Sequence, residues 1–267
     1  MTNRKEWRLG CSASYCGKFD ESVMEAYAAN GFDCAEISFR YDYYDNIDWR
    51  SIPQWSKNTG TELWSVHLPF TRKEINIAYP DKAVSNVAVA FQRNLIARAG
   101  EAGAKVIVIH PSSEPIADED RPMLLQRCGE NLGKLIDKAK EYGMQVAVEN
   151  LPRTCLCNCR DDVRYLLEQL PDLRVCFDTN HLLKEKNEDF VRAFGDKIIT
   201  LHISDYDFID ERHQFPGDGQ INWRNLMAEL EAVDYAGPFM YEVGQNHLTG
   251  RTTLADLKQN HDWLMGL

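Results

Sequence analysis

Residues 175–183 place a carboxylate and an imidazole at the end of an apolar run. The run ends at Asp178, and His181 follows three residues later. An ionised aspartate that is buried without a partner costs several kcal/mol, so Asp178 is expected either to face solvent or to hold a cation. Aspartate and histidine both bind divalent metals, and the segment is therefore a candidate for a metal site, a substrate site or ordinary surface.

The overall charge favours small-molecule chemistry. The chain has 267 residues, of which 30 are basic and 41 acidic, and its formal net charge is −11. This charge opposes nonspecific attraction to nucleic acid and to anionic membranes, so neither is expected as a partner. The first residues lack the apolar core of a signal peptide, and no segment approaches the roughly 18 apolar residues of a spanning helix. We therefore expect a cytoplasmic protein whose eight cysteines are reduced.

Short apolar segments alternate with amphipathic helical patterns along the chain. Strands are predicted at residues 7–13, 34–38, 62–68, 105–110, 145–150, 174–178, 198–204 and 239–243. Helices are predicted at residues 20–30, 48–58, 81–103, 120–142, 160–169, 186–194, 222–233 and 252–264. Asp20 is expected to cap the first helix, and Gly31, Gly103 and Gly143 are expected to end helices. This alternation predicts an α/β protein with one domain over residues 1–267, a (β/α)8 TIM barrel with a buried parallel sheet.

In such a barrel the carboxyl ends of the strands surround the active site, so the residue at each strand end bears on function. Seven predicted strands end in an acidic residue or a histidine: Glu36, His67, His110, Glu149, Asp178, His202 and Glu242. One histidine in this place would most often be a hydrogen-bonded structural residue. Several carboxylates at one mouth, however, repel one another and raise one another's pKa values. A divalent cation would resolve that conflict.

Four of these residues are predicted to share one metal ion. Glu149, Asp178, His202 and Glu242 end strands that are consecutive neighbours around the barrel, and adjacent strands lie about 4.8 Å apart. Three carboxylates and one imidazole form an oxygen-rich set that suits Mn²⁺ or Mg²⁺ and also accepts Co²⁺ or Zn²⁺. Mn²⁺ is the preferred expectation.

Five segments, in this order and spacing, resemble the xylose isomerase-like TIM barrels. They are VAVENL (146–151), VCFDTNHLL (175–183), ITLHISD (199–205), HQFPGDGQINW (213–223) and MYEV (240–243). The superfamily includes sugar and sugar-phosphate isomerases and epimerases, hydroxypyruvate isomerase and endonuclease IV. By resemblance to its ketose 3-epimerases, Glu149 and Glu242 bind the metal and exchange the substrate proton. The same resemblance implies that Asp178 and His202 complete the metal shell and that His181 contacts substrate.

The sequence departs from the epimerase pattern near residue 213. Those enzymes place an arginine before x-x-P-G, whereas this chain has His213. Glu211 and His213 resemble the D-x-H element that supplies a third metal in endonuclease IV, with Glu in place of Asp. His67 and His110 match the first metal site of that nuclease. The candidates for a second metal or for substrate binding are His67, His110, His181, Glu211, His213 and Glu36.

Proton transfer next to a carbonyl is the chemistry that this set of residues supports. A proton α to a carbonyl is too weakly acidic for a bare carboxylate, so a metal must polarise the carbonyl and stabilise the enediolate. The sequence therefore predicts a metal-dependent isomerase or epimerase of a small keto sugar, polyol or sugar phosphate, with Glu149 and Glu242 as acid and base. Three alternatives stay open: a dehydratase of the inosose or dehydroshikimate type, an endonuclease IV-like abasic-site nuclease, and a noncatalytic sugar-binding barrel.

A small sugar or keto acid is the expected partner. Whether it is phosphorylated is left open, and so is whether the chain assembles into a homo-oligomer.

The segment PGDG at 216–219 could hold a phosphate through backbone N–H groups ahead of a helix. Pro-Gly and Asp-Gly are, however, first of all turn formers, and a turn is the favoured interpretation.

Overall fold

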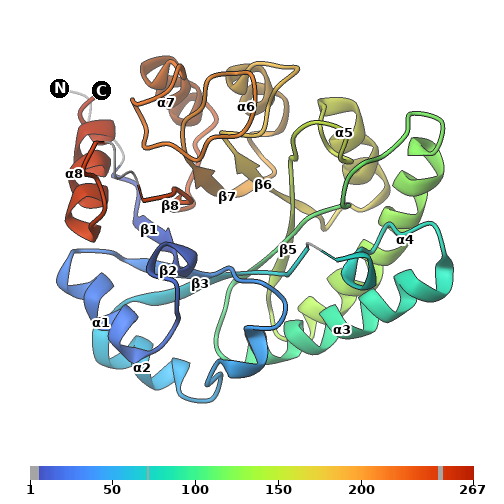
Figure 1. Ribbon diagram of the computed structural model, residues 1–267, viewed down its shortest axis with the longest axis horizontal. Helices are drawn as coiled ribbons and strands as arrows, with labels where there is room; N and C mark the ends of the chain where they lie inside the picture. Colours follow the sequence, from blue (N-terminus) through green and yellow to red (C-terminus); the bar gives the residue numbers. More distant parts are fainter. Residues whose placement is uncertain (1–5, 71, 246–248) are drawn as a thin grey trace.

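Eight parallel strands close into a barrel in the computed structural model, which describes residues 6–70, 72–245 and 249–267 (Figure 1). The strands are β1 (Leu9–Ser12), β2 (Cys34–Ile37), β3 (Glu62–His67), β4 (Val106–Ile109), β5 (Gln145–Glu149), β6 (Arg174–Asp178), β7 (Ile198–Ile203) and β8 (Phe239–Tyr241). Each strand pairs with its neighbours in chain order, and β8 closes the barrel by placing Phe239 opposite Leu9 of β1. The predicted TIM barrel is confirmed.

Helices surround the strands, and each predicted helix is confirmed within a few residues (Figure 1). They are α1 (Glu21–Ala29), α2 (Ile52–Thr59), α3 (Lys82–Glu101), α4 (Arg121–Lys140), α5 (Arg160–Gln169), α6 (Asn187–Phe194), α7 (Trp223–Ala232) and α8 (Leu254–Met265). Short 3-10 helices that the sequence did not predict follow the first three strands: η1 (Ala13–Cys16), η2 (Tyr44–Asn46) and η3 (Lys73–Ile75).

The helix ends follow the expected capping chemistry. Asp20 accepts a hydrogen bond from the backbone N–H of Val23 at 3.2 Å and so satisfies one free donor of the first turn of α1. Gly31, Gly103 and Gly143 adopt φ values of 77°, 88° and 69° just after α1, α3 and α4. A side chain would oppose this left-handed backbone, which is why glycine ends these helices.

The barrel interior is filled with apolar side chains below its carboxyl end. Val106, Val108, Ala147 and Cys176 form one buried cluster there, with Trp64 packed against it. Alternate residues of the strands face outward onto the helices, as where Phe177 of β6 stacks on Phe190 of α6 with ring centroids 5.2 Å apart. Because this packed interior closes the barrel from below, functional chemistry is confined to the strand ends.

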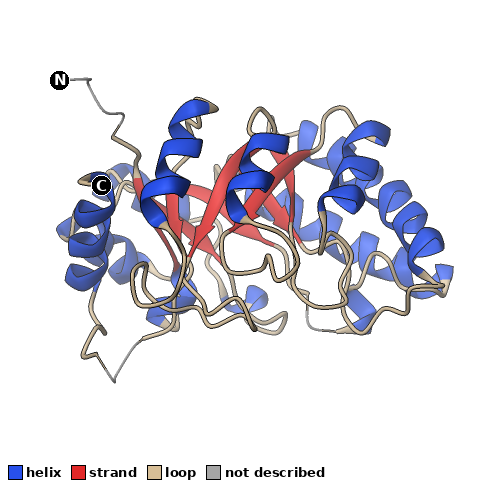
Figure 2. Cartoon of the chain, turned by 90° about the horizontal axis from the view of Figure 1, so that it is seen from above, coloured by secondary structure: helices blue, strands red, loops and turns tan. Residues whose placement is uncertain are grey.

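Long loops gather on one side of the strands, and the segment leading into β1 enters from the other side (Figure 2). The loops therefore lie at the carboxyl ends of the strands. In the described part of the chain, no helix combines the length and the apolar character needed to cross a bilayer. All eight cysteines are free thiols, as expected.

Candidate active site

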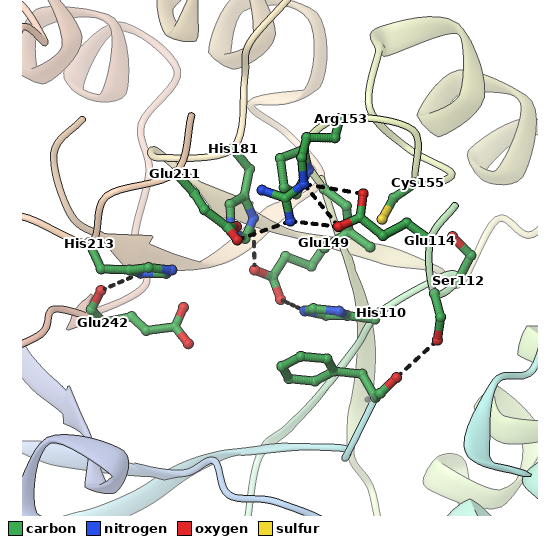
Figure 3. Close-up of a pocket in the computed structure, with 14 residues that line it drawn as sticks. His110, Ser112, Glu114, Glu149, Arg153, Cys155, His181, Glu211, His213 and Glu242 are labelled. Carbon is green, nitrogen blue, oxygen red and sulfur yellow. Dashed lines mark hydrogen bonds and ion pairs between the residues drawn. The ribbon is translucent and has the colours of Figure 1, made fainter. Parts of the chain in front are cut away.

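A pocket of about 320 Å³ opens at the carboxyl ends of the strands (Figure 3). Loops that follow β3 to β8 contribute its lining. The sequence-predicted site residues among the lining are His110, Glu149, His181, Glu211, His213 and Glu242. His67, Asp178 and His202 lie behind them, buried and in contact with Glu149 or His181. The barrel thus brings together side chains that are up to 175 residues apart in sequence (67 to 242).

Three carboxylates converge on one nitrogen of His202. The Nδ1 atom lies 3.0 Å from Oε2 of Glu242, 3.2 Å from Oε1 of Glu149 and 3.8 Å from Oδ2 of Asp178. One imidazole nitrogen can donate only one hydrogen bond, so this arrangement exceeds what His202 alone can satisfy. The candidate ligand atoms of the four residues all lie within 4.8 Å of one another.

The environment of Asp178 tests whether a cation fits this group. Its Oδ1 accepts from the N–H of Asn180 at 2.6 Å, whereas its Oδ2 is buried without a hydrogen-bond partner in the described chain. An unsatisfied buried acceptor costs about 1–3 kcal/mol. Burial raises the pKa of Asp178 to about 7, and the Glu149 and Glu242 carboxylates add to this rise against the opposing effect of His181. A divalent cation would supply the missing partner and neutralise the crowded carboxylates, so the four residues fit one.

Glu149 lies at the centre of the site, between four imidazoles. Its Oε2 is 2.9 Å from Nε2 of His67 and 3.3 Å from Nε2 of His110. Its Oε1 is 3.2 Å from Nδ1 of His202 and 3.4 Å from Nδ1 of His181. Burial alone would raise the pKa of Glu149, but the charge of His202 and the hydrogen bonds from His110 and His181 hold it well below its usual value. Glu149 is therefore a carboxylate, able to accept a proton or to bind a metal.

His67 and His110 form a second donor group with Glu149. The Nδ1 of His67 lies 2.8 Å from the carbonyl oxygen of Leu68, which directs Nε2 toward Glu149. The ring of Phe70 stacks on His110 with centroids 3.8 Å apart. Burial lowers the pKa of His110 to about 4, so this imidazole is neutral at neutral pH. A neutral imidazole can bind a metal or a substrate hydroxyl.

A third donor group consists of His181, Glu211 and His213. The Nε2 of His181 is 3.2 Å from Oε2 of Glu211. His213 lies beside them with a left-handed backbone (φ 48°), and its Nδ1 is 3.1 Å from the carbonyl oxygen of Glu242. Strained backbone at non-glycine residues concentrates at functional sites, which agrees with a role for His213. Glu211 thus lies close to both histidines, with the candidate ligand atoms of the three residues within 4.8 Å of one another.

Two asparagines that the sequence analysis did not single out hold these groups in place. Asn150 exchanges two hydrogen bonds with the backbone of Asp178, at 2.8 and 2.9 Å, and so ties β5 to β6. Asn180 accepts from the N–H groups of Arg212 and His213 and so fixes the loop that carries the third group. Each asparagine directly follows or lies within a strand-end motif, ENL or DTNH, and that adjacency was the signal available.

Glu36, unlike most of the other predicted site residues, lies away from the pocket, beside His202. It is fully buried and is not among the described residues that line the pocket. Its Oε1 lies 3.2 Å from Nε2 of His202, on the ring edge opposite the carboxylate cluster, and its Oε2 accepts from the hydroxyl of Ser65 at 2.7 Å. Glu36 therefore contacts His202 on the side away from the carboxylate cluster, and its role in a second metal site or in substrate binding stays a prediction.

Comparisons with known proteins show a family match and several partial relatives. A family model described as xylose isomerase-like TIM barrel matches residues 24–266. The probable endonuclease 4 of Mycoplasmoides gallisepticum is 26% identical over 179 residues, which cover 61% of this chain and 58% of the relative. The fructoselysine 3-epimerase of Escherichia coli O157:H7 is 30% identical over 118 residues, or 42% of each chain. The matches thus span about half the length of these two relatives.

The fold also matches solved structures. A crystal structure of a D-tagatose 3-epimerase-like protein superposes with a TM-score of 0.81, covering 96% of this chain and 95% of that one. Its sequence identity is 24%, so this likeness shows a shared barrel fold.

Proposed function

The chain belongs to the xylose isomerase-like TIM barrel family, and from this premise we propose that it is a metal-dependent isomerase or epimerase of a small keto sugar, polyol or sugar phosphate. The observation that carries the proposal is the placement of two carboxylates. Glu149 and Glu242 both line the pocket, and both approach the same atom, Nδ1 of His202, within 3.2 and 3.0 Å. A small substrate in the pocket would therefore have an acid/base group from β5 and another from beyond β8.

Glu149, Asp178, His202 and Glu242 would hold the metal ion, with Mn²⁺ as the preferred ion. When bound, a divalent cation there supplies polarisation of the substrate carbonyl and stabilises the negative charge that proton removal creates.

The protein residues then have distinct tasks. Glu149 removes the proton from the carbon next to the carbonyl, and its lowered pKa keeps it in the carboxylate form that this requires. Glu242 takes a proton from solvent and delivers it to the neighbouring face or carbon, and Glu149 releases the abstracted proton to solvent, so both carboxylates regain their starting form. His110 is neutral and partly exposed in the pocket, and it accepts a hydrogen bond from a substrate hydroxyl. His181, whose Nε2 lies 3.2 Å from Oε2 of Glu211, contacts the substrate beside them.

The proposal is tested by deuterium incorporation. Protein loaded with Mn²⁺, and in parallel with Mg²⁺, is incubated in D₂O with D-fructose, D-tagatose, D-ribulose, D-xylulose, their terminal phosphate esters, inosose, 3-dehydroshikimate and hydroxypyruvate. Incorporation next to the carbonyl of any compound supports proton abstraction, and absorbance of a conjugated enone would assign a dehydratase instead of an isomerase. Absence of incorporation in every compound would favour a noncatalytic barrel.

A second candidate function, abasic-site nuclease, is favoured by one specific observation: the described chain holds three donor groups at one pocket. The first two groups share Glu149, and the third consists of His181, Glu211 and His213. The formal charge of −11 opposes binding to DNA. Incubation with duplex DNA that contains one abasic site decides between the two, because nicking at that site would replace the isomerase proposal.

A further inference from the structure

Arg153 is surrounded by carboxylates at the rim of the pocket (Figure 3). Its Nη2 lies 2.7 Å from Oε1 of Glu114 and 3.0 Å from Oε1 of Glu211. Its Nη1 lies 2.7 Å from Oδ1 of Asp210, and its Nε donates to Oε1 of Glu114 at 2.9 Å. Every nitrogen of the guanidinium is therefore engaged. We call Arg153, Glu114, Asp210 and Glu211 the Arg153 cluster.

The Arg153 cluster has three carboxylates for one guanidinium. The hydrogen bond from His181 lowers the pKa of Glu211 to about 2, and Arg153 lowers the pKa of Asp210, so both are ionised at neutral pH. Among the described residues that line the pocket, Arg153 is the one lysine or arginine. No free guanidinium or ammonium in that lining can therefore pair with an incoming anion.

The PGDG segment does not supply an anion site either. The N–H groups of Gly217 and Ile221 donate to the buried Asp205 at 2.8 and 3.1 Å. A Cβ on Gly219 would lie 2.3 Å from Oδ1 of Asp205, so the loop is wrapped closely around this carboxylate. Within the segment, the N–H of Gly217 is thus taken by Asp205, and the N–H of Asp218 donates to the carbonyl oxygen of Phe215 at 2.9 Å, so neither is offered to a phosphate. The turn interpretation of this segment agrees with that arrangement.

We infer that the pocket takes an uncharged polyhydroxy ketone and discriminates against phosphate esters and keto acids; this inference rests on the proposed function and narrows its substrate class. A phosphate or carboxylate beneath the Arg153 cluster would lose its hydration and meet carboxylate oxygens instead of donors. A hydroxyl group can instead donate a hydrogen bond to Glu114 or Glu211, and bonds to ionised acceptors are strong. Arg153 is then a positioning residue for these two acceptors.

The experiment compares each ketose of the panel as the free sugar and as its terminal phosphate ester. Two readouts are taken on the Mg²⁺-loaded protein: deuterium exchange, and binding by ligand-observed saturation-transfer NMR. The test variant Glu114→Gln/Asp210→Asn removes two negative charges of the cluster but keeps hydrogen-bond acceptors. The control variant Asp161→Asn/Asp172→Asn removes two charges from exposed side chains outside the pocket.

We expect kcat/KM and affinity to be about tenfold or more higher for the free ketoses than for their esters. The phosphate of an ester is repelled by the carboxylates of the Arg153 cluster, because like charges repel where solvent does not screen them. The test variant should narrow that ratio severalfold, and the control variant should leave it unchanged. Equal or better use of the esters by the unmodified protein would overturn the inference while the proposed function stands. Tighter binding of free ketoses without exchange on any compound would support the inference and reject the proposed function. If the test variant left the preference for free ketoses over their esters unchanged, that result would also overturn the inference.

Discussion

The carboxylate of Glu36 and the imidazole of His202 form a fully buried pair, with Oε1 of Glu36 3.2 Å from Nε2 of His202. Oε2 of Glu36 also lies 3.2 Å from Nε2 of His202, and it accepts a hydrogen bond from the hydroxyl of Ser65 at 2.7 Å. A proton on Nε2 faces Glu36, so Nδ1, which faces the carboxylate cluster, is the nitrogen that would bind a metal. Carboxylates that fix the tautomer of a metal-binding histidine in this way also raise its basicity.

We expect Glu36→Gln to weaken metal binding by about tenfold, because the amide loses the charge that holds the Nε2 proton. The measurement is the dissociation constant from titration of chelator-treated protein with Mn²⁺. Ser65→Ala is the matched variant: it loses one hydrogen bond to Glu36 and should have a smaller effect. An unchanged dissociation constant in Glu36→Gln would show that the pair is only structural.

Glu149→Gln and Glu242→Gln should each reduce deuterium exchange by at least about 10², since an amide cannot accept the substrate proton and general acid–base groups contribute roughly 10²–10⁴. Exchange is measured by NMR at saturating substrate. Thermal unfolding of both variants serves as the control for correct folding. A variant that still exchanges at the normal rate would remove its residue from the chemistry.

Chelation should lower the melting temperature by several degrees. A metal that binds only the folded chain adds RT ln(1 + [L]/Kd), which is roughly 3 kcal/mol at a hundredfold excess over Kd. The four-donor group of Glu149, Asp178, His202 and Glu242 is formed in the fold, from strands that separate on unfolding. Calorimetry with and without EDTA measures the shift. The same melting temperature in both samples would argue against a metal site.

The number of bound ions is the fourth prediction. We expect one tightly bound ion in the four-donor group, because only this group combines three carboxylates with an imidazole. A weaker second ion at His67, His110 and Glu149 is the main alternative. Elemental analysis of protein purified without chelator measures the count. His67→Ala and His213→Ala each remove a ligand from one of the other two groups. Three equivalents of zinc that fall to two in both variants would contradict the one-ion prediction and support the nuclease.

The barrel and most of its site followed from local sequence patterns. Apolar segments at strand spacing and amphipathic segments at helix spacing define eight units, and a parallel barrel brings every strand end to one face. Glu149, Asp178, His202 and Glu242 could therefore be predicted to share a site without coordinates, because they lie at the ends of consecutive strands. Glu149 and Asp178 are the last residues of β5 and β6, His202 is one residue before the end of β7, and Glu242 directly follows β8.

Other relationships depend on tertiary structure. Glu36 lies in β2 one residue before its end, and the position of its side chain depends on barrel register, which local patterns do not encode. Arg153 meets carboxylates 39 and 58 residues away in sequence, from two other loops. A sequence pattern reports which side chains stand at a strand end, whereas the balance of charge in the pocket depends on how separate loops fold over it. The sequence was therefore enough to predict a class of chemistry. The contact between Glu36 and His202 and the carboxylates around Arg153 were decided by the packed fold.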